Sequence, residues 1–174
     1  NHVVKFVLSG LKKSPKSILD PMAGNGSFLK ECYLKFPSAK IMGVELDSNH
    51  SYDNSSIQFF HDDIFHLVQN QIKDKIFEQF STIVGNPAYI NYQNLNNHTL
   101  NNTKNYENDY KSFLLETMKE IADYTDEYSK LYDVFRLWSK LGDLNAYTLI
   151  LSWLLTKPGG TIAFVMSNHW MERD

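Results

Sequence analysis

The sequence predicts an α/β fold built on a doubly wound, mostly parallel sheet. Short apolar segments alternate along the chain with stretches of helical periodicity, which is typical of this class. The apolar segments are nearly continuous, as expected for parallel strands that are buried on both faces. At 174 residues, the chain is long enough for one ordinary domain with a sizeable core.

Five segments fit buried strands because each is short, apolar and closed by turn or polar residues. They are residues 17–20, 40–45, 56–60, 81–85 and 160–166. Between and around them, apolar residues recur at helical spacing. The predicted helices span residues 3–11, 27–36, part of 64–80, 110–122, 128–138 and 144–155.

Residues 88–110 differ in composition from the rest of the chain. This stretch holds eight asparagines, so we expect a polar, Asn-rich loop. Residues 110–156 follow as a helical insertion that ends in a sheet-covering helix, because 144–155 is apolar on nearly every side. The segment Lys157-Pro158-Gly159-Gly160 then predicts a helix stop and a turn into the fifth strand.

Composition excludes several classes of protein. The net charge of -3 is not that of a basic nucleic-acid module. One cysteine, Cys32, excludes an internal disulfide framework and a multi-cysteine zinc site, and it suits a reducing cytoplasm. The six histidines form no HxxH or HxxxH pair, so we expect no metal site. No apolar run reaches about 18 residues, so we expect no membrane span.

A glycine-containing turn follows the first predicted strand. Gly24 and Gly26, spaced by one residue between a strand and a helix, let the backbone turn tightly and approach a ligand closely. A dinucleotide fingerprint has a third glycine where Leu29 stands. Asp20, at the end of the strand, would repel phosphate and attract a cationic group. The alternative is an ordinary strand-to-helix turn.

Acidic residues also follow the second and third predicted strands. Glu45 lies 21 positions after Gly24, where an acid accepts hydrogen bonds from ribose hydroxyls. Asp62 or Asp63 could accept from an adenine amino group, although a helix N-cap is the alternative. Together the three strand ends predict a pocket for a nucleoside that carries a positive charge and no phosphate.

The fourth predicted strand ends in Asn86-Pro87-Ala88-Tyr89. Asn86 offers an amide oxygen as an acceptor, and Pro87 keeps it out of helical geometry. Tyr89 places an aromatic face beside them. Taken alone, this segment is more typical of a simple turn after a strand.

Taken together, these segments resemble the motifs of S-adenosylmethionine-dependent DNA adenine-N6 methyltransferases of bacterial restriction–modification systems. Their order is that of the gamma arrangement, in which the cofactor motif precedes the catalytic motif. Residues 18–29 are similar to the DPxxGxGxFL motif, and 44–47 and 62–65 to the second and third motifs. Residues 86–89 resemble the NPPY motif, except that Ala88 stands in place of the second proline.

This resemblance implies a class I methyltransferase, Rossmann-like fold, with S-adenosyl-L-methionine as the cofactor. Asp20 and the glycines would hold its methionine part, and Glu45 its ribose hydroxyls. Asp63, more than Asp62, would bind the adenine amino group, with Ile64 packed on the ring. The full set of implied cofactor-binding residues is Asp20, Ala23, Gly24, Gly26, Glu45, Leu46, Asp63 and Ile64.

The resemblance also implies three catalytic residues, Asn86, Pro87 and Tyr89. Asn86 and the Pro87 carbonyl would accept the two N–H bonds of the target amine, and Tyr89 would stack on the flipped base. Ala88 should soften this loop without removing an acceptor, so we expect activity to survive. The absence of a Pro-Cys dipeptide argues against cytosine-C5 methylation, which needs a thiolate nucleophile.

The fold of this family has seven strands, whereas five are found here. We therefore expect residues 1–174 to form one catalytic domain that is incomplete, with the last strands and the target-recognition domain beyond it. The expected partners are DNA, contacted through those further parts, and a specificity or restriction subunit or a fused domain. We expect a cytoplasmic location and no membrane association.

Two alternatives stay open. The first is an amino-methyltransferase that acts on RNA or on a protein glutamine, because those enzymes carry similar Asn-Pro-Pro motifs. The second is a cofactor-binding module without catalytic activity. Cytosine N4 also competes with adenine N6 as the target amine.

Overall fold

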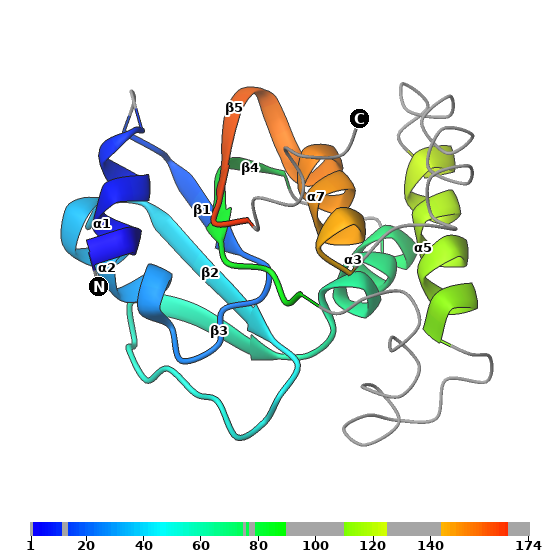
Figure 1. Ribbon diagram of the computed structural model, residues 1–174. Coiled ribbons are helices and arrows are strands. Elements are labelled where there is room, and N and C mark those ends of the chain that lie inside the picture. The colour runs from blue at the N-terminus through cyan, green and yellow to red at the C-terminus, as the bar shows by residue number, and fades with distance from the viewer. Residues whose placement is uncertain are drawn as a thin grey trace. The chain divides into compact units, whose positions relative to one another are not determined.

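The structure is a computed structural model, and it describes residues 2–11, 14–74, 76, 79–89, 110–124 and 144–166 (Figure 1). The chain divides into two compact units. The first unit comprises residues 1–61, 80–87 and 156–174, and the second comprises residues 62–79 and 88–155. The first unit contains the sheet, and the helices that follow the third and fourth strands belong to the second.

The first unit is built on a five-stranded, wholly parallel sheet with the order β3-β2-β1-β4-β5 (Figure 1). Its strands are β1 (Ser17–Asp20), β2 (Lys40–Glu45), β3 (Ile57–His61), β4 (Phe80–Gly85) and β5 (Thr156–Phe164). The chain builds outward from β1 to β3, then returns to the other side of β1 for β4 and β5. This reversal confirms the predicted doubly wound, Rossmann-like α/β fold. Ligands bind such sheets at the carboxyl ends of the strands flanking the reversal, here β1 and β4.

Two helices pack with this sheet, namely α1 (His2–Ser9) and α2 (Ser27–Lys35). Their apolar side chains join those of the strands in one core cluster, because helical spacing places them on one face of each helix. The helical members are Val4, Leu8, Phe28, Leu29 and Cys32, all buried. Burial of each large apolar side chain contributes about 1.5–3 kcal/mol.

Two serines join β1 and β4 where these strands begin. The Ser81 hydroxyl donates to the Ser17 carbonyl over 2.8 Å and accepts from the Ser17 N–H over 2.9 Å. The Ser17 hydroxyl accepts from the Ser81 N–H over 3.0 Å. These bonds align two strands that are 64 positions apart in the sequence, so that their carboxyl ends lie side by side.

The second unit contains α3 (Ile64–Lys73), α5 (Tyr110–Tyr124) and α7 (Leu144–Leu155), with α5 in contact with both other helices. The predicted burial of α7 is confirmed for most of its residues, whereas Leu149 and Ile150 are half-buried and Trp153 is 46% exposed. In the part of the chain that the structure describes, no helix is both long and apolar enough to span a bilayer.

The fifth strand differs from its prediction. It begins at Thr156 instead of Gly160, because Thr156 already pairs with Phe80. The next pair joins Thr82 to Thr161, so the four residues predicted as a turn form an irregularity within the strand. The predicted helix 128–138 lies outside the described residues, as does the Asn-rich loop except for residues 88, 89 and 110.

Candidate functional site

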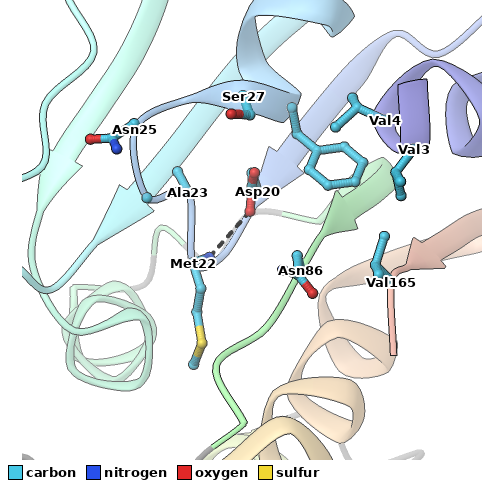
Figure 2. A pocket seen from close by; sticks show the side chains of 11 residues that line it. Val3, Val4, Asp20, Met22, Ala23, Asn25, Ser27, Asn86 and Val165 are labelled. Carbon is cyan, nitrogen blue, oxygen red and sulfur yellow. Dashed lines mark hydrogen bonds between the residues drawn. The ribbon is translucent and has the colours of Figure 1, made fainter. Parts of the chain in front are cut away.

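A pocket of about 410 Å³ lies where β1 and β4 end, and all of its lining belongs to the first unit (Figure 2). The glycine turn after β1 supplies four of the lining residues, and the others come from the end of β1, from α1 and α2, and from the residues that directly follow β4 and β5. The lining residues are Val3, Val4, Asp20, Met22, Ala23, Gly24, Asn25, Ser27, Phe28, Asn86 and Val165. Asp20 is the one ionisable side chain among these described residues.

Asp20 is a buried acid, with 1% of its surface exposed. Its Oδ1 accepts from the Met22 N–H over 3.3 Å, as the dashed line in Figure 2 indicates. Burial raises the pKa of the Asp20 carboxyl to about 8, the Met22 hydrogen bond opposes the rise, and the nearby Glu45 carboxylate adds to it. A carboxyl in this environment gains most from a ligand that brings a positive charge or a hydrogen-bond donor.

Glu45 joins the end of β2 to the glycine turn. Its Oε2 accepts from the Gly24 N–H over 2.6 Å, and its Oε1 accepts from the Asp47 N–H over 2.9 Å. Both oxygens are therefore held in place by backbone donors. A carboxylate offers about four acceptor positions, so this one keeps the capacity to bind hydroxyl groups.

The glycines of the turn adopt conformations that other residues rarely take. Gly24 has a φ of 52° and Gly26 a φ of 71°, both in the left-handed region. A Cβ at position 24 would meet no atom within 4 Å, so the backbone there faces open space. Gly85, at the end of β4, lets the backbone pass close to the Asp20 carboxyl, because a Cβ at position 85 would lie 2.8 Å from the Asp20 Oδ1.

Asn86 directly follows β4, and its exposed side chain lines the pocket opposite the turn of Asp20 (Figure 2). The Val165 N–H donates to the Gly85 carbonyl over 2.9 Å, which extends the β4–β5 pairing up to Asn86. Pro87 is buried. Tyr89 belongs to the second unit, is 50% exposed, and has its pKa raised by the burial of its hydroxyl.

Asp63 and Ile64 also belong to the second unit, where both are buried. Asp63 is the N-cap of α3, and its side chain accepts from the Phe65 N–H over 2.8 Å. The sequence offered this N-cap as an alternative to adenine binding. A carboxylate has about four acceptor positions, so the cap bond does not exclude adenine binding, which stays a prediction.

The pocket brings together four of the residues implied by the resemblance, namely Asp20, Ala23, Gly24 and Asn86. Glu45 reaches the same turn through its hydrogen bond to Gly24. The other implied residues lie outside the pocket lining: Gly26 is buried at the start of α2, Leu46 is half-buried after β2, and Pro87, Asp63, Ile64 and Tyr89 are placed as described above.

The apolar wall of the pocket was not predicted from the sequence, and it is formed by Val3, Val4, Phe28 and Val165. Their apolar character predicted only burial in a core. No local pattern indicates that the N-terminal helix and the end of the fifth strand reach the same cavity. Cys32 is a buried member of the core, and burial raises the pKa of its thiol to about 12, which disfavours the reactive thiolate.

The fold and the pocket define a Rossmann-like α/β protein with an acid-bearing site at the switch point of its sheet. No family model matches the chain. It is 36% identical over 80 residues to "Modification methylase CviBIII" of Paramecium bursaria Chlorella virus NC1A, a match that covers 42% of this chain. The match covers 19% of that curated relative, so it concerns about a fifth of the relative's length.

Solved structures of several classes resemble the fold. A SAM-dependent methyltransferase from Agrobacterium tumefaciens is 11% identical, with a TM-score of 0.36 over 49% of this chain and 30% of that one. Human N-acetylserotonin methyltransferase in complex with SAM is 13% identical, with a TM-score of 0.41 over 92% and 42%. A short chain dehydrogenase family protein from Francisella tularensis subsp. tularensis SCHU S4 is 14% identical, with a TM-score of 0.42 over 91% and 52%. TM-scores of this size do not separate one class from another.

Proposed function

We propose that this chain is the catalytic part of an S-adenosylmethionine-dependent methyltransferase that modifies the N6 amine of a flipped adenine in DNA. One observation carries the proposal. The acid and glycine of the predicted cofactor motif and the asparagine of the predicted catalytic motif, which are more than 60 positions apart, line a single pocket. A cofactor and a target amine could therefore meet there.

The chemistry of the pocket fits this cofactor. Its volume of about 410 Å³ is within the range of small-molecule sites. Asp20 could accept from the cofactor's ammonium group, and the pocket lining brings no cationic side chain to compete for it. Glu45, beside Gly24, could accept from ribose hydroxyls. S-adenosylmethionine, when bound, supplies a methyl group on a positively charged sulfur.

Asn86 would activate the target. The lone pair of an adenine amine is delocalised into the ring, which makes the nitrogen a poor nucleophile. The Asn86 amide oxygen and the Pro87 carbonyl would accept its two N–H bonds and favour a pyramidal nitrogen. Methyl transfer would form the nitrogen–carbon bond as the sulfur–carbon bond breaks and would leave neutral S-adenosylhomocysteine, and the nitrogen would afterwards lose one proton to water. Exposure of the Asn86 side chain suits a substrate that enters from outside.

The match to a modification methylase favours DNA over the other substrates of amino-methyltransferases. The proposed partners of the whole protein are DNA and a specificity or restriction subunit, or a fused domain with that role. The proposed location is the cytoplasm.

The test is transfer of labelled methyl from S-adenosylmethionine to duplex DNA, tRNA and a glutamine-containing peptide, offered in parallel. We expect label in DNA, and N6-methyladenine after digestion of that DNA to nucleosides. Asn70→Ala is the control for substitutions of Asn86. It changes an asparagine on α3 that lies outside the pocket lining, and it should leave methyl transfer unchanged. Label found only in tRNA or only in the peptide would contradict DNA as the substrate. N4-methylcytosine in the digested DNA would contradict adenine as the target base. Cofactor binding without any transfer would indicate a module without catalytic activity.

A further inference from the structure

The ring of Tyr52 lies directly on the glycine turn. A Cβ built on Gly26 would stand 2.5 Å from both Cγ and Cδ2 of Tyr52, and 2.8 Å from its Cβ. Real side chains do not approach so closely. The space that any other residue would need at position 26 is therefore filled by Tyr52.

Tyr52 stands in the loop between β2 and β3, and this loop meets the glycine turn at a second point. The loop begins after Glu45, whose Oε1 accepts from the Asp47 N–H and whose Oε2 accepts from the Gly24 N–H. One carboxylate and one aromatic ring thus join the same two segments. Both segments belong to the first unit.

Tyr52 supports the turn from outside the pocket. It is half-buried and packs against the core cluster that includes Ala23 and Phe28, two residues that line the pocket. Tyr52 itself is not among the lining residues. An effect of Tyr52 on a ligand in this pocket would therefore be exerted through the turn.

We propose that Tyr52 is a positioning residue of the cofactor site, whose ring holds the Gly24–Gly26 turn in its ligand-binding conformation. This inference rests on the proposed function. Glycine has more backbone freedom than any other residue, so a turn with two glycines loses much entropy when it is ordered. A ring packed on the turn restricts it before the ligand arrives, and the Gly24 N–H stays within reach of Glu45. Without the ring, the ligand itself would have to order the turn.

The test compares cofactor affinity, measured by calorimetry with S-adenosylmethionine, among Tyr52 variants of the protein. We expect Tyr52→Ala to raise the Kd about tenfold and to raise the KM for cofactor with little change in kcat. Tyr52→Phe keeps the ring and should stay within about twofold of the wild-type Kd. Tyr52→Leu keeps apolar bulk on Gly26 and should fall between them, and it provides the same comparison if Tyr52→Ala does not fold.

Tyr33→Ala is the matched control. Tyr33 is also a half-buried tyrosine that packs on the same core cluster outside the pocket lining, but it lies on α2, and the atoms nearest a Cβ on Gly26 all belong to Tyr52. We expect this variant to lower the melting temperature and to leave the cofactor Kd unchanged. Equal losses of cofactor affinity in Tyr52→Ala and Tyr33→Ala would mean that Tyr52 acts only as a core residue.

Gly26→Ala tests the contact itself. In the wild type, the added methyl would meet the Tyr52 ring and also strain a φ of 71°. In Tyr52→Ala only the backbone strain should persist, so Gly26→Ala should cost less affinity and less melting temperature in that background. Equal costs in both backgrounds would contradict the packing of Tyr52 on Gly26.

The outcomes separate this inference from the proposed function. A wild-type protein that binds no S-adenosylmethionine overturns both. A wild type that binds, together with a Tyr52→Ala variant that binds equally well, overturns the inference alone.

Discussion

The two sides of the pocket differ in how far their polar groups are exposed. On the glycine-turn side, Asp20 is buried, and both oxygens of Glu45 accept backbone N–H groups. On the other side, Asn86 follows the last residue of β4 with an exposed side chain, and Ala88 stands where the resembled motif has proline. The difference suits the two ligands of the proposed function. A cofactor that is the same molecule in every turnover gains from a prearranged site. A base that is flipped out of a duplex needs an open approach.

The sharpest way to test this division is to remove the acceptor on the open side. Asn86→Ala should lower kcat for methyl transfer by about 10²–10³-fold, the usual effect of deleting one preorganised hydrogen-bonding group from a reaction centre. The Kd for S-adenosylmethionine should stay within about twofold of the wild type, as calorimetry would measure. A loss of cofactor affinity as large as the loss in kcat would mean that Asn86 binds the cofactor, and it would contradict the division of the pocket into two sides.

Glu45→Gln should have the opposite profile. The new amide must present an NH₂ group to the N–H of either Gly24 or Asp47, each of which now meets a carboxylate oxygen. We expect the cofactor Kd to rise about 30-fold, with a smaller change in kcat at saturating cofactor. Asn54→Ala, in the same β2–β3 loop, is the control and should bind as the wild type does. An unchanged Kd in Glu45→Gln would show that the carboxylate is not needed for the ligand.

The buried carboxyl of Asp20 predicts how stability depends on pH. Its folded-state pKa of about 8 lies above the ordinary value of 3.8, so the folded protein binds a proton that the unfolded chain releases. This contribution to stability is complete below about pH 4 and is lost as the pH rises to about 8. Urea unfolding between these values should show it as a fall in the free energy of unfolding of about 1.4 kcal/mol per pH unit.

Asp20→Asn should remove this slope, because the amide does not titrate. Asp53→Asn, which changes an exposed carboxylate of the β2–β3 loop, should retain it. Identical slopes in the wild type and in Asp20→Asn would mean that Asp20 stays ionised when the protein is folded.

The smallest expected effect concerns Ala88. Ala88→Pro would restrict the backbone of Pro87 to extended conformations and stiffen the segment after Asn86. Such a substitution contributes about 0.4–1 kcal/mol where the backbone can accept it. If this whole free energy stabilised the transition state, the rate constant of methyl transfer would rise about two- to fivefold. Single-turnover experiments would measure this rate constant. An inactive wild type together with an active Ala88→Pro would show that the natural loop does not support catalysis.

Much of this molecule follows from local patterns in its sequence. The parallel strands, the helices α1, α2, α3, α5 and α7 and the glycine turn lie close to the predicted positions. The predicted start of β5 was wrong. The Lys157–Gly160 segment has strong turn propensity, but the strand already begins at Thr156, which pairs with Phe80. Whether Asp63 caps a helix was open in the sequence, and the hydrogen bond to Phe65 answered it.

The sequence by itself determined the alternation of strands and helices, the two glycines after β1 and the asparagine after β4. These features depend on residue types a few positions apart, and such short-range preferences act wherever the segment lies in the fold. The tertiary structure decided that β1 and β4 are neighbours, that Asp20 is buried beside Glu45 and that Tyr52 covers Gly26. Desolvation, charge proximity and packing depend on which distant segments meet, and that is fixed when the apolar surfaces of the whole sheet and its helices are buried together.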